Sequence, residues 1–177
     1  VKEILMELKQ SSLKSQLPEL TDQEKHAYEM MAQSDFMRHL IQKSNVSVRD
    51  FSNLEVEFHH LNIPLKTSEQ VYLVLGNLTY PKNTTYTKQT NILHYVRSYW
   101  EQKFSSQLKS LSIMDRYGDL VWFIQMKEDK PFTPQHLLDY LEGNLEMIQD
   151  DCLQIMDLTL QFTMSNGPVD WQSVSEK

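Results

Sequence analysis

The sequence contains few of the residues that bend or cross-link a chain. Among 177 residues there are four glycines, six prolines and a single cysteine, Cys152. The scarcity of glycine and proline excludes collagen-like and low-complexity architectures. A single cysteine excludes an intrachain disulfide framework and a multi-cysteine zinc site, and it is compatible with a reducing, cytoplasmic location, which we expect for this protein.

Long hydrophobic runs are also missing. The longest, such as Val71 to Leu75, fall far short of the ~20 residues that a membrane-spanning helix needs, so no membrane partner is expected. The chain instead combines 40% hydrophobic with 23% charged residues, which is typical of one globular domain with an appended element. Because no initiator methionine precedes Val1 and no signal peptide is visible, we expect a domain cut from a longer chain.

Negative charge is concentrated in one stretch and missing from another. The formal net charge is −7. Residues 128–157 are rich in acids and contain a single base, Lys130, whereas residues 70–100 contain no Asp or Glu. Neutralising phosphates needs clustered Lys and Arg. The charge therefore argues against nucleic-acid binding by this part of the chain, and DNA would be reached only through another domain.

The first residues predict a short amphipathic helix within residues 1–16. Its apolar positions recur at helical spacing; they are Val1, Ile4, Leu5 and Leu8. Such a helix is too short to be stable alone, so it must pack on something. Two alternatives remain open here. The helix either lies on its own domain, or it ends a parallel coiled coil that continues from an upstream domain and joins two copies of the chain.

Residues 17–66 are predicted to form a helical segment. Thr21 followed by Glu24 is a capping-box pattern that begins one helix. The apolar face of this helix is expected to comprise Ala27, Tyr28, Met31, Phe36, Leu40 and Ile41. A second capping-box pattern begins another helix at Ser47, and Pro64 is expected to end it. The buried stripe of this second helix is predicted to be Phe51, Leu54, Phe58 and Leu61.

Residues 67–177 alternate between strand and helix patterns. Strands are predicted at residues 71–79, 111–114, 120–126 and 158–164. Helices are predicted around residues 92–104, from Thr133 as N-cap with Pro134 in the first turn, and again from Pro168. The resulting β-α-β-β-α-β order predicts an α/β (α+β) domain with a ferredoxin-like antiparallel sheet, covered on one face by two helices.

The two middle strands are joined by a hairpin in which Gly118 supplies the positive φ that a tight turn needs. The hairpin resembles the RYGGDEF hairpin of diguanylate cyclases through Arg116, Tyr117, Gly118 and Asp119, while the second Gly and the Glu of that motif are missing. The resemblance covers roughly residues 68–177. It implies a degenerate GGDEF-like domain.

The missing acids bear directly on activity. A cyclase of this family needs carboxylates from its first strand and from the hairpin to hold a divalent metal against a nucleoside triphosphate. Asn77 and its neighbours occupy the strand end where acids would be needed, and Asp119 alone cannot replace a pair of ligands. We therefore predict no catalytic residue, no cofactor and no metal, with a residual diguanylate cyclase as the enzymatic alternative. Cys152 follows Asp150 and Asp151, which would raise its pKa rather than activate it.

The wider pattern is similar to the degenerate, cyclase-like central domains of AraC-type response regulators. The apolar helices before the first strand carry this similarity, together with Asp170 and Trp171, which resemble the start of the helix that closes such a domain. The resemblance implies a cytoplasmic, two-component transcription regulator that acts as a homodimer. In it, this domain would couple an upstream phosphoreceiver domain to a downstream helix-turn-helix domain that binds DNA.

A small-molecule sensor is the alternative from a different functional class. Lys82, Lys88 and Arg97 lie in the acid-free stretch, and with Arg116 of the hairpin they would favour an anionic ligand or a nucleotide. The competing interpretation is that these bases form an ordinary solvated face.

Overall fold

The computed structural model describes residues 21–42, 48–115, 118–127 and 133–171 of the chain. In chain order its elements are α2 (Asp22–Gln42), α3 (Val48–His60), β1 (Tyr72–Thr79), α4 (Tyr86–Phe104), β2 (Leu108–Met114), β3 (Leu120–Met126), α5 (Pro134–Met156) and β4 (Thr159–Met164). This mixture of helices and an antiparallel sheet confirms the predicted α+β class. Within the described residues no helix is both long enough and apolar enough to cross a membrane.

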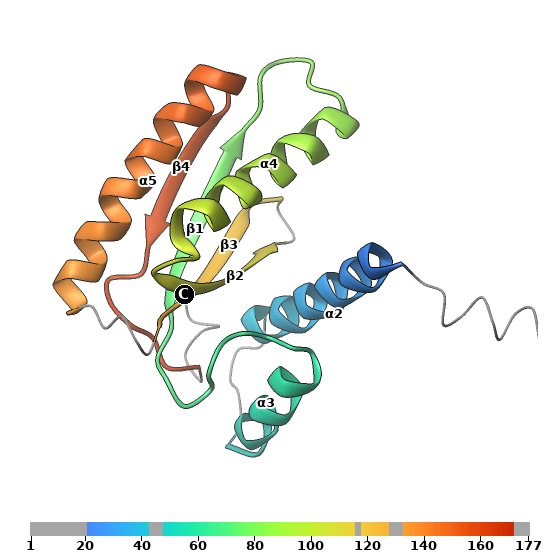
Figure 1. The fold of residues 1–177 in the computed structure, drawn as a ribbon, viewed down its shortest axis with the longest axis vertical. Helices are drawn as coiled ribbons and strands as arrows, with labels where there is room; N and C mark the ends of the chain where they lie inside the picture. The colour runs from blue at the N-terminus through green and yellow to red at the C-terminus, as the bar shows by residue number, and fades with distance from the viewer. Residues whose placement is uncertain (1–20, 43–47, 116–117, 128–132, 172–177) are drawn as a thin grey trace, which may run out of the picture.

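The four strands form one antiparallel sheet in the order β2-β3-β1-β4 (Figure 1). The chain passes from β1 through α4 to β2, and from β3 through α5 to β4, so each helix crosses over one intervening strand. The bounds predicted for β3 are confirmed. β2, however, begins at Leu108, three residues before the predicted Leu111. The prediction began too late because Ser110 interrupts the apolar pattern. Its hydroxyl accepts a hydrogen bond from the indole of Trp100 at 3.3 Å, so this polar residue belongs to the strand.

The first face of the sheet carries the larger hydrophobic core, beneath α4 and α5. At its centre Trp100 of α4 stacks on Trp122 of β3, with ring centroids 4.2 Å apart. The Trp122 indole N–H is buried without a hydrogen-bond partner among the described residues. On β1, Gly76 lies so close that an added Cβ would be 2.6 Å from Cζ3 of Trp122.

The start of α5 is determined by local capping, as predicted. Thr133 is the N-cap and accepts a hydrogen bond from the His136 N–H at 3.3 Å, while Pro134 occupies the first turn. The helix ends at Asp157, whose φ of 53° is in the left-handed region. Leu158 then enters the core, and β4 follows directly.

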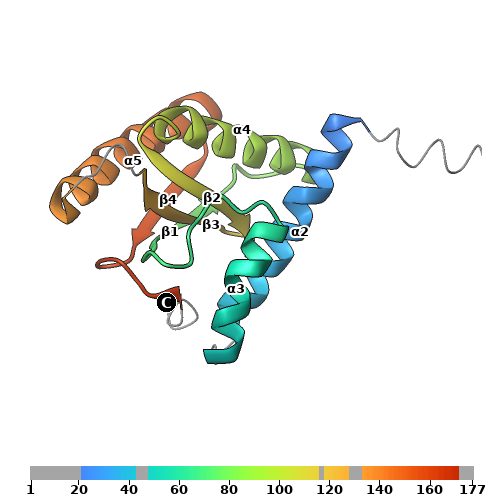
Figure 2. The same ribbon diagram turned by 60° about the horizontal axis from the view of Figure 1, so that its bottom comes forward.

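The second face of the sheet carries its own core, and this corrects the expectation that helices cover one face only. α2 and α3 pack against this face, and Figure 2 shows them across the sheet from α4 and α5. The buried members of this core are Met37, Leu40, Leu54, Phe58, Ile63, Leu65, Val71, Ile113, Phe123, Val169 and Trp171. Residues on both sides of the predicted boundary at residue 67 thus share one core, while that boundary itself remains a prediction.

The apolar face predicted for α2 is wrong in its first half. Tyr28 and Met31 are each 62% exposed, and every residue from Thr21 to Tyr28 is exposed. In the second half Met37 and Leu40 are buried. The helix has 21 residues and is about 31 Å long, and its contribution to the second core comes from its second half. Helical spacing identifies the apolar face of a helix, but it does not show which part of that face is covered by the rest of the fold.

The end of α3 is determined by Asn62 rather than by Pro64. Asn62 has a φ of 55°, its N–H donates to the His59 carbonyl at 3.2 Å, and the Ile63 N–H donates to the Phe58 carbonyl at 2.9 Å. This is a Schellman motif, in which a left-handed residue terminates the helix. Within the predicted stripe, Leu54 and Phe58 are buried as expected.

The segment after β4 differs from the predicted helix start at Pro168. Val169 forms an isolated antiparallel bridge with Val71, with both backbone hydrogen bonds at 2.8 to 2.9 Å. Trp171 follows in a 3₁₀ conformation and is 1% exposed. The chain is therefore still part of the folded core at Trp171.

Candidate functional site

The hairpin between β2 and β3 is closed by its own backbone. The Asp115 N–H donates to the Asp119 carbonyl at 2.8 Å, and the Gly118 N–H donates to the Asp115 carbonyl at 3.2 Å. The Asp119 N–H also donates to the Asp115 carboxylate at 3.0 Å. Gly118 has a φ of 85°, which confirms the predicted need for glycine at this position. Arg116 and Tyr117 of the predicted motif lie outside the described residues.

The hairpin meets the end of β1. The register that pairs Gly76 with Leu120 places Asn77 opposite Asp119. The Asn77 side-chain N–H donates to the Asp119 carboxylate at 3.3 Å. Burial, and to a smaller extent the charge of Asp119, raise the pKa of the nearby Tyr80 hydroxyl. The two segments that would carry the metal ligands of a cyclase are thus adjacent, but one of them contributes an amide.

This amide changes the chemistry that the site can perform. A divalent cation needs several oxygen ligands with negative charge among them. Here the donor group of Asn77 occupies one oxygen of Asp119, and the Asp115 carboxylate accepts a hydrogen bond from its own hairpin. Across the described residues, no group of three or more His, Cys, Asp or Glu side chains could hold a metal ion.

The bases of the acid-free stretch do not converge on one cleft. The Arg97 guanidinium donates to the Ser112 hydroxyl at 2.8 Å and to the Ser112 carbonyl at 3.0 Å. Burial lowers its pKa, and the charge of Glu101 opposes that shift. Lys88 lies nine residues earlier on the same helix, about 13 Å away along its axis, and Lys82 lies in the loop before it. Arg116 lies outside the described residues.

Arg97 and a second arginine instead close the outer edge of β2. Arg38 of α2 donates from Nε to the Met114 carbonyl at 3.0 Å, two residues along the strand from the Ser112 carbonyl. Both carbonyls point away from β3. The two guanidinium groups therefore supply hydrogen-bond donors to carbonyl groups at this edge of the sheet. No local pattern indicates this role, because each arginine is far from its acceptor along the chain.

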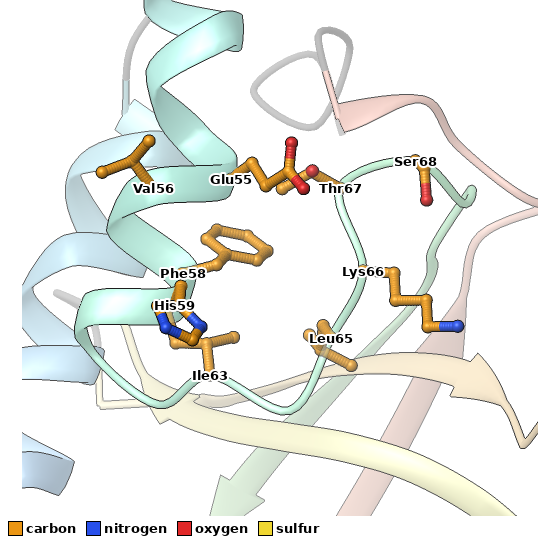
Figure 3. Close-up of a pocket in the computed structure, with 9 residues that line it drawn as sticks. All are labelled: Glu55, Val56, Phe58, His59, Ile63, Leu65, Lys66, Thr67 and Ser68. Carbon is orange, nitrogen blue, oxygen red and sulfur yellow. The ribbon is translucent and has the colours of Figure 1, made fainter.

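A hollow of about 680 Å³ lies between α3 and the segment that leads into β1 (Figure 3). Its apolar floor is formed by Phe58, Ile63 and Leu65. Glu55 of α3 and Lys66 of the segment that leads into β1 both line it, so the lining carries both signs of charge (Figure 3). Sequence patterns did not predict this hollow, because it depends on where the segment returns to α3.

Beside this hollow, a buried glutamine of β3 holds the segment between α3 and β1 in place. Gln125 is 1% exposed. Its side-chain oxygen accepts from the Lys66 N–H at 2.7 Å, and its side-chain nitrogen donates to the Lys66 carbonyl at 2.7 Å and the Glu69 carbonyl at 3.3 Å. The Trp171 indole N–H also donates to the Lys66 carbonyl, at 3.0 Å. One backbone position thus joins the sheet, the helical segment and the end of the described chain.

A second buried glutamine joins the two helices of the helical segment. Gln33 of α2 donates to the Leu61 carbonyl at 2.8 Å and to the Asn62 carbonyl at 3.2 Å. These carbonyls belong to the turn that ends α3. The glutamine therefore fixes α2 relative to α3 at the point where the chain turns toward the sheet.

On the opposite side of the molecule, α4 and α5 are linked by a tyrosine and a carboxylate. The Tyr99 hydroxyl donates to the Asp151 carboxylate, and this bond, with burial as a lesser cause, raises the pKa of Tyr99 to about 12. Burial, assisted by Asp151, raises the pKa of Cys152 to about 11. The predicted direction for Cys152 is confirmed, although burial is the larger cause. At neutral pH this cysteine is a protonated core residue and a poor nucleophile.

The Tyr99 bond predicts a loss of stability in alkaline solution. An unfolded tyrosine loses its proton near its ordinary pKa of 10.0, whereas the folded Tyr99 keeps it up to about 12. The stabilisation is therefore complete below pH 10 and is lost as the pH rises toward 12. We expect Tyr99→Phe to be less stable than the unchanged chain in urea unfolding at pH 9, with a smaller deficit at pH 11. Tyr86→Phe, at an 84% exposed position, is the matched control; an equal Tyr99→Phe deficit at both pH values would contradict the assignment.

The predicted dimer helix, with Val1, Ile4, Leu5 and Leu8, lies outside the described residues. Comparisons with protein-family models, with curated proteins and with solved structures each returned no match to this chain.

Proposed function

We propose that this chain is a non-enzymatic regulatory and dimerisation domain of a cytoplasmic transcription regulator. In this proposal it has a degenerate cyclase-like, ferredoxin-like fold, and it couples an upstream phosphoreceiver domain to a downstream AraC-type helix-turn-helix domain. The sheet order β2-β3-β1-β4, with a helix crossing over one strand in each half, supports the ferredoxin-like assignment.

The hydrogen bond from Asn77 to Asp119 is the observation that carries the non-enzymatic part of the proposal. It lies where the first strand meets the hairpin, which is where a cyclase would place its metal-binding carboxylates. The Asn77 amide occupies one oxygen of the Asp119 carboxylate and supplies no negative charge from β1 for a metal ion. The scaffold is thus compatible with a domain that keeps the cyclase shape without its chemistry.

The second core offers a route for mechanical coupling. Trp171, near the end of the described chain, packs edge-on against Phe58 of α3 with ring centroids 4.9 Å apart, and stacks on Phe123 of β3 at 6.1 Å. A displacement of α3 would therefore reach the C-terminal segment directly, without crossing the sheet. In the proposed mechanism, a signal that arrives before α2 shifts α3, and the shift repositions the chain that follows Trp171.

Two measurements test the proposal. Incubation of the chain with guanosine triphosphate and Mg²⁺ is expected to give no cyclic dinucleotide by chromatography, with an active diguanylate cyclase as the positive control; formation of product would overturn the non-enzymatic assignment. Deletion of residues 1–16 is expected to reduce the light-scattering mass from dimer to monomer. An unchanged mass would show that this segment does not mediate self-association.

The same preparation separates the proposal from a small-molecule sensor. In thermal-shift screening with guanine and adenine nucleotides and phosphorylated sugars, a sensor would gain stability with its ligand. For the proposed regulatory domain we expect no such gain, since Arg97 already hydrogen bonds to Ser112. A nucleotide-dependent rise in melting temperature that disappears in Lys88→Ala would favour the sensor instead.

A further inference from the structure

The two edge strands of the sheet, β2 and β4, differ in how their outward backbone groups are hydrogen bonded. At the β2 edge, the Ser112 and Met114 carbonyls accept hydrogen bonds from Arg97 and Arg38, and α2 packs alongside. The opposite edge is formed by β4, which pairs with β1 on its inner side. Proteins usually protect an edge strand by charge, proline or cover, because its free backbone groups can pair with another chain.

The register shows which backbone groups of β4 point outward. The Ser165 N–H donates to the Leu73 carbonyl at 2.9 Å, so this pair is hydrogen bonded. Because such pairs alternate along an antiparallel ladder, the backbone groups of Leu160, Phe162 and Met164 point away from β1. Among the described residues nothing hydrogen bonds to these outward groups. The strand reads Thr-Leu-Gln-Phe-Thr-Met and contains neither a charged residue nor a proline.

α5 determines what an added strand would meet. The helix packs over β4 and runs along its outer side (Figure 1). Tyr140, which hydrogen bonds to the Lys103 carbonyl, marks the flank that faces α4. Glu142 lies two residues further, about 200° around the helix, and so belongs to the flank beyond β4. Glu142 and Glu146 are exposed there, as is Leu153 at 50%.

We propose that the β4 edge binds an extended segment of a partner polypeptide as a fifth strand of the sheet. Main-chain hydrogen bonds to Leu160, Phe162 and Met164 would hold the segment, as in other cases of strand addition. Its side chains on the α5 side would alternate between apolar residues, which pack beneath the helix, and Lys or Arg, which face Glu142 and Glu146. α5 contains no Lys or Arg, so the flank is uniformly acidic or neutral.

The charge of α5 also argues against a second copy of the chain as the occupant. Two β4 strands paired about a two-fold axis would bring the outer flanks of two α5 helices side by side. Glu142 and Glu146 of one copy would then face their counterparts in the other, and juxtaposed like charges disfavour association. A basic partner strand gains from the same arrangement.

The test uses a phage-displayed library of random nine-residue peptides, selected on the whole chain. In an added strand every second residue faces α5. We expect enrichment of peptides in which these residues are alternately apolar and Lys or Arg. In hydrogen exchange, the selected peptide should slow the amides of Leu160, Phe162 and Met164 by about tenfold or more, because a hydrogen bond must open before exchange occurs.

Two variants test the two parts of the recognition. Met164→Pro removes an outward N–H that makes no bond to β1, so the fold should survive while peptide binding is lost. The exposed double substitution Glu142→Lys with Glu146→Lys should abolish the preference for basic peptides. The proposal is overturned if no alternating basic peptide is enriched, if binding is unchanged in both variants, or if the slowed amides lie elsewhere. It is equally overturned if sedimentation shows a dimer that Met164→Pro dissociates, since a second copy would then occupy the edge.

Discussion

Replacing Trp171 by alanine is expected to lower the free energy of unfolding by about 3–5 kcal/mol, the range for deleting a large buried aromatic side chain. The indole is 1% exposed and touches Phe58 of α3 and Phe123 of β3. Its removal would leave a cavity where the helical segment, the sheet and the C-terminal segment meet. It would also remove the hydrogen bond from the indole N–H to the Lys66 carbonyl.

Trp171→Phe separates these two contributions. The phenyl ring keeps much of the packing but cannot donate to Lys66, so we expect a loss of only about 1–2 kcal/mol. Urea unfolding followed by circular dichroism measures both variants. A loss below about 1 kcal/mol for Trp171→Ala would contradict the burial described for this residue. It would also weaken the coupling route proposed through α3.

The second large effect is expected for Gln125→Leu, at about 2–4 kcal/mol, because a buried donor or acceptor left unpaired costs about 1–3 kcal/mol. Leucine has a similar size but cannot replace the three hydrogen bonds that the amide makes to Lys66 and Glu69. The Lys66 carbonyl would keep the indole of Trp171 as a donor, whereas the Lys66 N–H would lose its hydrogen bond to the Gln125 side chain. The segment that enters β1 would therefore be released from β3.

A matched pair of variants checks this interpretation. Gln102→Leu, on the exposed side of α4, should change stability by no more than about 0.5 kcal/mol. Gln125→Glu places a carboxyl group in the same buried position, where its pKa should rise. Because the protonated acid can donate as the amide does, the loss in Gln125→Glu should be smaller at pH 4 than at pH 7. Equal stability of Gln125→Leu and the unchanged chain would show that the hydrogen bonds from Gln125 to Lys66 and Glu69 do not stabilise the fold.

Elements with local signals were predicted well. Thr133 and Pro134 specify the start of α5 through a cap and a fixed φ, which depend only on neighbouring residues. The run from Leu120 to Met126 likewise identifies β3 without help from the rest of the chain. The end of α3 was predicted at Pro64, whereas Asn62 terminates the helix. An asparagine that adopts the left-handed conformation is a weaker sequence signal for a helix end than a proline is.

Long-range contacts at the candidate site were not predictable in the same way. Gly118 identified the hairpin turn, but the contact of Asn77 with Asp119 depends on the register between β1 and β3. Arg97 suggested an anion site from composition alone, whereas the fold directs it to the β2 edge. No sequence pattern distinguishes Gln125 from other polar residues, because its partners lie on the segment around Lys66, which is distant along the chain.

Gly76 restricts the substitutions by which this strand end could acquire a metal ligand. Any side chain at this position would meet Trp122, whose ring is itself stacked on Trp100, so a carboxylate there would require the aromatic centre of the core to be rebuilt. Asn77, by contrast, is exposed beside Asp119 and differs from aspartate by one functional group. On β1 the simplest substitution that would place a second carboxylate beside Asp119 is therefore at residue 77, with the packing around Gly76 left intact.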